Sequence, residues 1–331
     1  MEDSDVSVLV TAAGAEGTPG KILRLREAGY RVVAADIDRR AAGLYLADQA
    51  YVVPHGHSPD YAPEVLRICA LERIRAVVPL VDEELLTVWA LADHGVQVLL
   101  PRAETVACCL DKLTLMELLY ESGVPVPKTR LAARGHDGLD FPIIVKPRWG
   151  RGSRGVFVVR DADDLALTLD RGGDDLSRVI VQEYVEGPEY STSVVLWRDR
   201  RVQAVVPKEV VFKEGSSRYA ISRHHPGVTE VCVRTAHVLS ADGPLNVQMR
   251  VDSSGTPRVF EINPRFSGSS ALTAAAGVDE IGGLLSQALN SDRRALRGTW
   301  RGGVAMVRHT TETFVAEPAF TERRWALGWR G

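Results

Sequence analysis

The residues best suited to metal or phosphate chemistry lie in the stretch from Leu245 to Ser270. Two runs of alternating polarity flank an Asp-Ser-Ser-Gly-Thr-Pro turn, which predicts a β-hairpin. Side chains alternate between faces along a strand, so we expect one apolar face, formed by Val247, Met249, Phe260 and Ile262. The opposite face would carry Gln248, Arg250, Glu261 and Asn263.

Three side chains of this polar face suit a hard divalent cation, because they offer one carboxylate and two amide oxygens: Gln248, Glu261 and Asn263. Mg²⁺ prefers such oxygen ligands and shares them with phosphates. Arg265 follows the second strand and would add positive charge. The alternative is a plain hairpin with a solvated polar face.

A second group of residues is suited to binding phosphate. Lys146 ends an apolar strand, and the glycine-rich loop after it contains Gly150, Gly152, Ser153 and Gly155. Glycines allow backbone N–H groups to approach anionic oxygens closely, and the lysine would add a point charge at the base of the loop. The alternative is a flexible hairpin turn beside a solvated lysine.

A third segment, from Gln182 to Glu189, is suited to the other end of a nucleotide. Its strand leaves the sheet at Gly187, and a strand edge offers adenine both a backbone donor and an acceptor. The Glu189 carboxylate would suit ribose hydroxyls, although an acidic strand end is an equal alternative. Lys112 opens a helix after Asp111 and is an ordinary surface lysine when taken alone.

Composition limits the class of protein. The chain has 331 residues, 45% of them hydrophobic and 25% charged, as in globular proteins of two or three domains. A net charge of −3 argues against nucleic acid as a partner. No apolar run approaches a membrane span, the acidic start lacks a signal peptide's basic region, and the four cysteines show no metal spacing. We therefore expect a cytoplasmic protein with free thiols.

The first hundred residues alternate between strands and helices. Strands are predicted at 6–10, 31–36, 76–80 and 97–100, with a helix before Gly29. This order predicts an open parallel sheet of the Rossmann-like type. Neither a Walker A motif nor a regular dinucleotide fingerprint is present, but Asp36 keeps an NAD-dependent dehydrogenase as an alternative.

Beyond an amphipathic helix at 110–121, the periodicity changes to that of strands, which predicts a separate α+β unit. Strands are expected at 143–145, 156–159, 179–182, 192–196, 202–206 and 304–308, and a helix at 281–289.

Together these segments resemble the ATP-grasp superfamily, in particular the synthetase domains of the carbamoyl phosphate synthase large subunit. The shared features, in order, are Asp111-Lys112, Val145-Lys146-Pro147, the glycine-rich loop, the segment 182–189, and the segment 248–270. The resemblance covers about residues 5 to 290. It implies ATP and Mg²⁺ (or Mn²⁺) as cofactors, bound between two α+β subdomains behind a Rossmann-like domain.

The resemblance also implies a role for each matched residue. Lys112, Lys146 and the loop residues Gly150, Gly152, Ser153 and Gly155 would contact phosphates. Glu183, Tyr184 and Val185 would surround adenine, and Glu189 would bind the ribose. Gln248, Glu261 and Asn263 would bind the metal, and Arg265 would stabilise the transferred phosphate. The implied domains are 1–108, a small lid subdomain at 109–186, and a large subdomain at 187–331.

The resemblance favours an ATP-dependent carboxylate–amine ligase that forms an acyl phosphate and releases ADP and phosphate. Its partners would be a small-molecule carboxylate and an amine, with a homodimer possible. Candidate substrate residues are Lys208, Arg223, His224, Ser267 and Gly268, the first three in a segment that reads equally well as a solvated basic loop. A bicarbonate-dependent carboxylase or carbamoyl phosphate synthase-like enzyme, and an ATP-binding regulator without turnover, remain alternatives.

Overall fold

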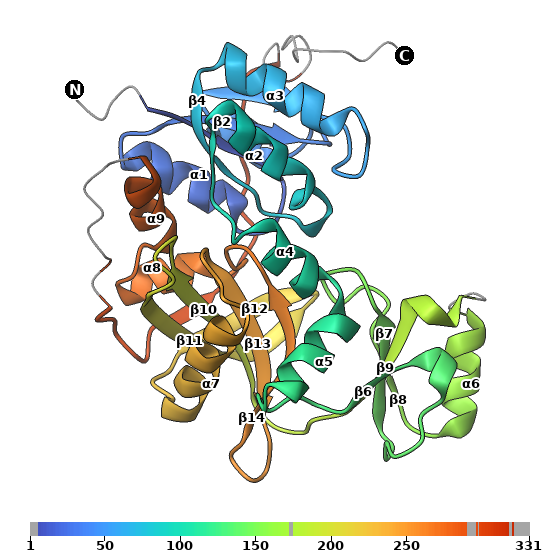
Figure 1. The fold of residues 1–331 in the computed structure, drawn as a ribbon. Coiled ribbons are helices and arrows are strands. Elements are labelled where there is room, and N and C mark those ends of the chain that lie inside the picture. The colour runs from blue at the N-terminus through green and yellow to red at the C-terminus, as the bar shows by residue number, and fades with distance from the viewer. Residues whose placement is uncertain (1–5, 172–174, 290–295, 297, 318–319, 321–331) are drawn as a thin grey trace.

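The computed structural model describes residues 6–171, 175–289, 296, 298–317 and 320. Within these residues the chain forms three β-sheets, each with its own helices (Figure 1). The N-terminal sheet is parallel, and the other two sheets are antiparallel. The α/β and α+β expectation is thereby confirmed. No helix among the described residues is long and apolar enough to cross a membrane.

The N-terminal sheet has the order β3-β2-β1-β4-β5. Its strands are β1 (Ser7–Val10), β2 (Arg31–Asp36), β3 (Gln49–Val52), β4 (Ile74–Val78) and β5 (Gln97–Val98). It is accompanied by α1 (Thr18–Glu27), α2 (Ala42–Leu46), α3 (Tyr61–Leu71) and the 3₁₀ helices η2 (Asp82–Glu84) and η3 (Thr87–His94). Every residue of β1 is buried, as expected for a parallel strand covered on both faces.

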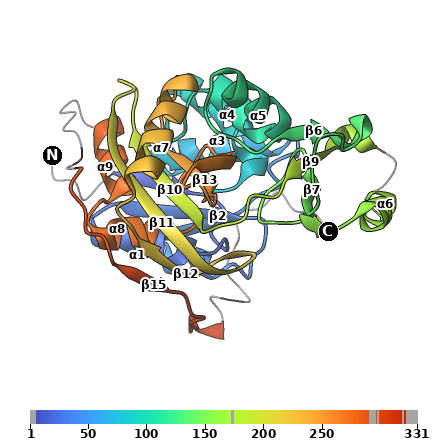
Figure 2. The ribbon, with the colours of Figure 1, turned by 90° about the horizontal axis from the view of Figure 1, so that it is seen from below.

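The four-stranded sheet has the order β6-β9-β7-β8 and lies to one side of the molecule (Figure 2). Its elements are β6 (Thr129–Leu131), η4 (Ala132–Arg134), β7 (Ile143–Pro147), β8 (Phe157–Val159), α6 (Ala162–Arg171), η5 (Leu176–Arg178) and β9 (Val179–Glu183). We call this unit the lid sheet. Its small core joins β7 and β9 to α6 through residues such as Ile143, Val181 and Leu165.

The six-stranded sheet has the order β14-β13-β10-β11-β12-β15. Its strands are β10 (Glu189–Leu196), β11 (Val202–Glu214), β12 (Ser216–Ser222), β13 (Leu245–Val251), β14 (Pro257–Asn263) and β15 (Ala305–Val307). The associated helices are α4 (Ala103–Leu110), α5 (Lys112–Glu121), α7 (Pro226–Val238), α8 (Ser270–Ala276) and α9 (Glu280–Leu289).

The long segment before Pro226, interpreted from its sequence as a loop, is instead the antiparallel pair β11–β12. Register shifts around Phe212 interrupt the regular alternation of side chains, which is why the pattern looked only weakly strand-like.

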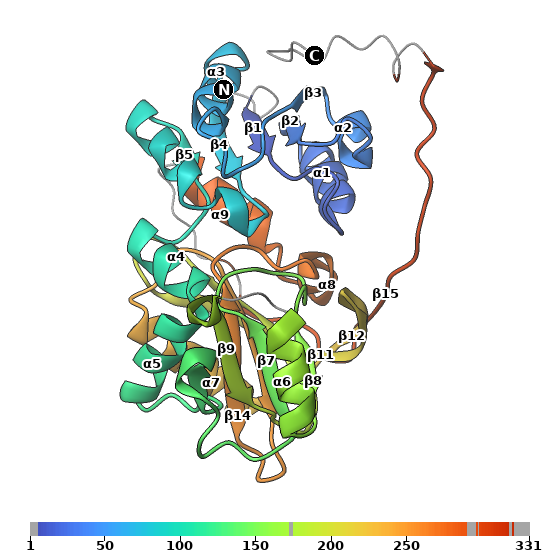
Figure 3. The ribbon, with the colours of Figure 1, turned by 90° about the vertical axis from the view of Figure 1, so that its right-hand side faces the viewer.

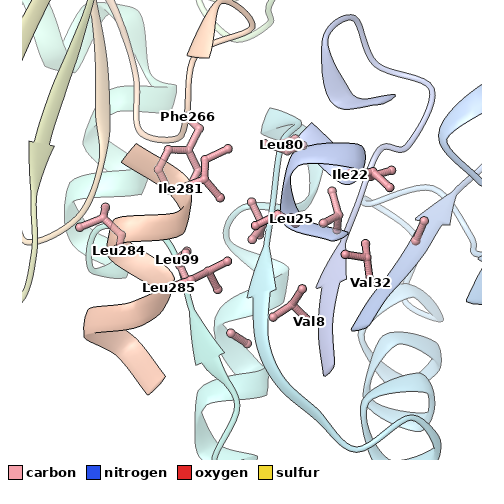
Figure 4. Packing of buried hydrophobic residues seen from close by; sticks show 14 of the residues in the cluster. Val8, Ile22, Leu25, Val32, Leu80, Leu99, Phe266, Ile281, Leu284 and Leu285 are labelled. Atoms are coloured by element: carbon pink, nitrogen blue, oxygen red, sulfur yellow. The ribbon is translucent and has the colours of Figure 1, made fainter. Parts of the chain in front are cut away.

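One hydrophobic core connects the N-terminal sheet to the six-stranded sheet. In Figure 4, Leu285 of α9 extends toward the strand that carries Val8, and Phe266 lies beside Ile281. Figure 3 shows α8 and α9 between the two sheets. This shared core fixes the loops of the N-terminal sheet over one end of the six-stranded sheet.

Helix α5 lies within the predicted lid subdomain in sequence, but it packs against the six-stranded sheet. Its apolar residues Leu115, Met116 and Leu119 belong to the core of the six-stranded sheet, together with Val247 and Ile262. The domain division implied by the resemblance placed this helix in the lid subdomain, residues 109–186. Its apolar stripe is buried against the larger sheet instead, which offers more apolar surface.

Candidate functional site

The hairpin β13–β14 carries the predicted metal ligands. Gln248 is paired with Glu261, and Asn246 with Asn263, across the antiparallel strands. The register shifts after Gln248, so that Met249 pairs with Val259. The apolar face predicted from strict alternation is therefore wrong at one position. Because of this bulge Val259 is fully buried, whereas Phe260 is only partly buried.

The predicted ligands Gln248, Glu261 and Asn263 all line one polar cavity of about 200 Å³. The Asn263 amide donates to Glu261 over 3.3 Å and accepts from Arg265 over 3.0 Å. Within the described part of the chain, no three acidic, histidine or cysteine side chains converge on a metal site. One carboxylate with two amide oxygens is nevertheless a donor set that fits Mg²⁺ or Mn²⁺.

Lys146 is the penultimate residue of β7 in the lid sheet, but its ammonium reaches the hairpin β13–β14, which we call the metal hairpin after its predicted ligands. The Nζ atom donates to the carbonyl oxygen of Phe260 over 3.1 Å and lies 5.6 Å from the centre of that ring. Burial lowers the pKa of Lys146 to about 8, although the charge of Glu261 opposes the shift. A buried ammonium beside a carboxylate is well placed to receive an anionic phosphate.

Lys112 lies close to Lys146 because of a well-defined helix start. Asp111 caps α5 by accepting from the backbone N–H groups of Leu113 and Thr114. Burial opposes ionisation of Asp111, yet hydrogen bonds from Arg148 hold the pKa of this carboxyl below its usual value. The Lys112 ammonium donates to the carbonyl of Gly150, so it contacts the glycine-rich loop directly.

The glycine-rich loop, residues 150–155, adopts backbone angles that need glycine. Gly150, Gly152 and Gly155 have positive φ, and so does Ser153. A small cavity of about 10 Å³ is lined by residues of this loop and by the two lysines, and Glu261 forms part of its wall. Glu261 thus faces both the loop cavity and the polar cavity. We call residues 150–155 the flap.

The predicted adenosine segment begins at the end of the lid sheet. The Glu183 carboxylate accepts a hydrogen bond from the backbone N–H of Lys128 over 3.0 Å. The centre of the Tyr184 ring lies 5.7 Å from the guanidinium carbon of Arg250. Val185 is buried. None of Glu183, Tyr184 and Val185 lines the polar cavity.

Glu189 lines the polar cavity, but both oxygens of its carboxylate are engaged. Lys213 donates to Oε1 over 2.7 Å, and Arg250 donates to Oε2 over 3.1 Å. A ribose hydroxyl would therefore meet a carboxylate already held between two cations.

The predicted substrate residues separate into two groups. Ser267 and Gly268 line the polar cavity. Lys208 does not; its ammonium is fully buried and donates to Ser193 over 2.7 Å and to Thr273 over 3.1 Å. Burial lowers the pKa of Lys208 to about 8, partly offset by Glu280.

Arg223 and His224 also lie away from the polar cavity. Arg223 forms an exposed ion pair with Glu209, and His224 stacks on Trp300 with ring centres 4.0 Å apart. Proximity in sequence did not bring these side chains together: Lys208 lies on β11, whereas Arg223 and His224 lie in the connection between β12 and α7.

The sequence analysis did not anticipate Arg308 as a cavity residue, and it did not distinguish Lys213 from the other basic residues between Pro207 and Pro226. Arg308, just after β15, donates to Glu16 over 2.8 Å and to the carbonyl of Gly268 over 2.9 Å. Lys213 lies on β11 and pairs with Glu189. Neither belongs to a recognisable motif, so only the pairing of β12 with β15 and β11 reveals their position.

A larger cavity of about 490 Å³ lies at the carboxyl ends of the N-terminal strands. The strand order reverses between β1 and β4, which is the usual position of a ligand crevice in such sheets. Asp36, the candidate for an NAD ribose, accepts from the backbone N–H groups of Gly14 and Asp38 and so shapes the loop beside the cavity. Arg151 and Arg154 of the flap form another wall.

Three families match different parts of the chain, two of which overlap over residues 175–224. Residues 8–99 match a family described as PylC-like, N-terminal domain, and residues 109–224 match a RimK-like ATP-grasp domain. Residues 175–312 match a family described as ATP-grasp in the biosynthetic pathway with Ter operon.

Curated relatives are similar over different lengths. A carbamoyl-phosphate synthase of Methanobrevibacter smithii is 24% identical to this chain. The match covers 80% of this chain and 76% of the length of that synthase. An uncharacterised protein of Sinorhizobium fredii is 29% identical over 55% of this chain, and a D-alanine–D-alanine ligase of Desulforudis audaxviator is 30% identical over 44%. The matches span only 42% and 47% of these last two relatives.

Solved structures share the fold at low sequence identity. The biotin carboxylase domain of Hydrogenobacter thermophilus 2-oxoglutarate carboxylase, in complex with MgADP and bicarbonate, gives a TM-score of 0.73 at 18% identity. The match covers 90% of this chain and 73% of the length of that domain. An L-amino acid ligase of Bacillus licheniformis gives a TM-score of 0.72 at 18% identity. This match covers 91% of this chain and 78% of the length of that ligase.

Proposed function

This chain belongs to the ATP-grasp superfamily, and from that membership we propose that it is an ATP-dependent ligase joining a carboxylate to an amine, with release of ADP and phosphate. One observation carries the proposal. Glu261 lines both the polar cavity, which the other two proposed metal ligands line, and the small cavity of about 10 Å³ that the flap and the two buried lysines line, here called the flap cavity, so the two cavities meet at this carboxylate. The similarity to a D-alanine–D-alanine ligase and to an L-amino acid ligase supports the same reaction class.

The nucleotide would lie between the lid sheet and the six-stranded sheet. Lys112 and Lys146 would contact its phosphates together with backbone N–H groups of the flap. Glu183, Tyr184 and Val185 would surround adenine, and Glu189 would accept from the ribose after release from one of its cations. Gln248, Glu261 and Asn263 would bind Mg²⁺, which screens the charge of the phosphate oxygens.

The reaction would then proceed in two steps. An oxygen of the substrate carboxylate attacks the γ-phosphorus of ATP, which forms an acyl phosphate and expels ADP. The amine nitrogen next attacks the activated carbonyl carbon, loses a proton, and expels phosphate. Lys146 and Arg265 would stabilise the negative charge of the transferred group, and the closed flap would exclude water from the acyl phosphate.

The substrates would occupy the two larger cavities. Ser267 and Gly268 lie on the polar cavity beside Arg265 and would orient the carboxylate near the phosphate. The cavity of about 490 Å³ beside the N-terminal sheet would hold the remainder of a small specialised molecule or amino acid. Lys208, Arg223 and His224 have no part in this proposal.

We divide the chain into three functional units. The N-terminal unit would supply the second substrate cavity, the lid sheet would supply Lys146 and the flap, and the six-stranded sheet would supply the metal ligands. Since α5 shares its core with the six-stranded sheet, the boundary of the lid unit is better placed after this helix than before it.

The proposal is tested by ADP and phosphate release from Mg-ATP in the presence of amino-acid pools, each with and without bicarbonate or ammonia. ADP formation that needs both a carboxylate and an amine supports the ligase. Tight ATP binding without turnover in any pool favours an ATP-binding regulator and contradicts the proposed reaction.

A carbamoyl phosphate synthase-like or carboxylase reaction is the second candidate. It is favoured by the match to a carbamoyl-phosphate synthase over 80% of this chain. In the same assay it predicts ADP release that bicarbonate alone stimulates.

A further inference from the structure

The 3₁₀ helix η2 of the N-terminal sheet consists of three consecutive acidic residues, Asp82, Glu83 and Glu84. Glu83 and Glu84 line the cavity of about 490 Å³, and Asp82 contacts Arg265. We propose that Asp82 and Glu83 are positioning residues, which hold Arg265 beside the metal ligands and Arg151 of the flap over the nucleotide. The inference rests on the proposed function and deepens it, because it assigns part of the catalytic geometry to a turn outside the ATP-grasp sheets.

Both arginines line the polar cavity, and each is held by a carboxylate of η2. Arg265 Nε donates to Asp82 Oδ1 over 2.8 Å, and Arg151 Nε donates to Glu83 Oε2 over 2.7 Å. Side-chain exposure is 13% and 14% in the first pair and 26% and 21% in the second. Both pairs are therefore partly shielded from water, where ion pairs are stronger than on an open surface.

The turn that carries these carboxylates is itself firmly held. Glu84 is buried, and its Oε1 accepts from Thr11 over 2.6 Å and from the N–H groups of Leu80 and Val81 over 3.0 and 3.2 Å. Tyr61 donates to its other oxygen. A carboxylate with four donors fixes the position of the residues directly before it.

Packing restricts the same turn from the opposite side. A Cβ atom on Gly56 would lie 2.7 Å from the carbonyl carbon and oxygen of Glu83, so the loop at Gly56 and the turn are in close contact. The turn is thus a rigid support and not a flexible acidic loop.

The flap, in contrast, has few other attachments. Lys112 binds its carbonyl at Gly150, and the chain from there to Gly155 has positive φ at four residues. Arg151 lines all three cavities: the polar cavity, the flap cavity, and the cavity of about 490 Å³ at the N-terminal sheet. The Glu83–Arg151 pair would therefore set how far the flap closes, with consequences for all three cavities.

Hydrogen–deuterium exchange of the peptide covering residues 148–156 tests the flap contact without any turnover. We expect Glu83→Gln to accelerate exchange there about fivefold, as for loss of one partly shielded ion pair. The charge-swapped double variant, Glu83→Arg with Arg151→Glu, is expected to restore slow exchange. Glu209→Gln, which breaks an exposed pair with Arg223, is the matched control. Unchanged flap exchange in Glu83→Gln overturns the inference and leaves the ligase proposal standing.

Turnover tests the contact with Arg265 through a double-mutant cycle. Asp82→Asn is expected to lower kcat about tenfold with little change in KM for ATP, and to have no further effect when Arg265 is already alanine. Additive losses in the double variant would show that Asp82 does not act through Arg265. If no substrate supports turnover, the ligase proposal fails, while the exchange experiment still decides the role of Glu83.

Discussion

The ammonium of Lys146 donates a hydrogen bond of 3.1 Å to the main-chain carbonyl of Phe260, the residue at the bulge of the metal hairpin. The lysine belongs to the lid sheet, whereas the carbonyl belongs to the six-stranded sheet. A bulge leaves one residue without a cross-strand partner, which makes this carbonyl available to the lysine. One contact between two sheets thus holds the proposed phosphate-binding lysine next to the hairpin that carries the proposed metal ligands.

Replacing Lys146 with alanine should remove a cation from the site of phosphoryl transfer. We expect kcat for ADP release to fall by about 10² to 10³, the range for loss of one preorganised stabilising group. Circular dichroism should show unchanged secondary structure. Arg160→Ala, at an exposed position of the same lid unit, is the control and should retain turnover. Near-normal turnover of Lys146→Ala would contradict the assigned role.

Nucleotide binding should depend on pH through the same lysine. Burial lowers its pKa from 10.5 to about 8, so the unliganded protein loses this positive charge as pH rises through about 8. ADP affinity should therefore fall by up to about tenfold per pH unit above that value. Calorimetric titration from pH 6.5 to 9.5 would measure it. In Lys146→Arg, whose guanidinium stays charged, the fall should disappear.

The same pKa shift should make the free energy of unfolding rise with pH, whereas it makes ADP affinity fall. Between about pH 8 and 10.5 the unfolded chain keeps the proton that folded Lys146 releases. The unfolded state then binds more protons, so the contribution of Lys146 to the free energy of unfolding increases with pH in this range. A Lys146→Met variant should lack this increase in urea titrations, and an unchanged pH profile would disprove the shifted pKa.

Glu261 should control the requirement for divalent metal. It is the only carboxylate in the predicted metal set with Gln248 and Asn263, so Glu261→Gln should raise the half-saturating Mg²⁺ concentration by at least about tenfold. Measuring ADP binding at a series of Mg²⁺ concentrations tests this independently of turnover. Glu209→Gln is the control for loss of a carboxylate outside the cavity. Equal Mg²⁺ dependence in the two variants would remove Glu261 from the metal site.

The sequence predicted the local features of this site well. The hairpin at Gln248 and Asn263, the lysine at the end of β7 and the flap all follow from alternation and glycine spacing within short windows. The parallel N-terminal sheet followed from the same local patterns, although β3 and α3 were not anticipated.

Contacts between distant segments could not be predicted in this way. Arg265 and Asp82 are 183 residues apart, and Arg151 and Glu83 are 68 apart. No periodicity within a strand or helix indicates such pairs, because they depend on how the sheets pack. The bulge at Phe260 was missed for a related reason: a single extra residue does not disturb the composition of a strand.

Lys208 was predicted to bind substrate, but its buried position indicates a role in stability instead. Its ammonium is buried against Ser193, Thr273 and the charge of Glu280. Lys208→Met should lower the free energy of unfolding by about 3 kcal/mol, because it leaves the Glu280 carboxylate buried without this cation. KM values for ATP and the carboxylate should not change. Adding Glu280→Gln should recover part of the stability, whereas a raised KM at normal stability would return Lys208 to the substrate site.

Gly187 is the point where the chain passes from the lid sheet into the six-stranded sheet, between the predicted adenine and ribose residues. Its φ is +139°, and an added Cβ atom would lie 1.9 Å from the carbonyl oxygen of Val251. Gly187→Ala must therefore displace backbone as well as strain its own dihedral angles, and we expect a loss of more than about 3 kcal/mol in stability.

Gly95 provides the matched control for this substitution. It also has positive φ, at +77°, but nothing lies within 4 Å of an added Cβ atom. Gly95→Ala should therefore cost only the dihedral strain of about 1 kcal/mol. Thermal unfolding of both variants, with and without Mg-ADP, separates the two effects. If nucleotide binds across this junction, Gly187→Ala should also weaken ADP binding and lose the stabilisation by ligand that Gly95→Ala retains. Equal stabilisation of both variants by Mg-ADP would place the nucleotide away from the segment 183–189.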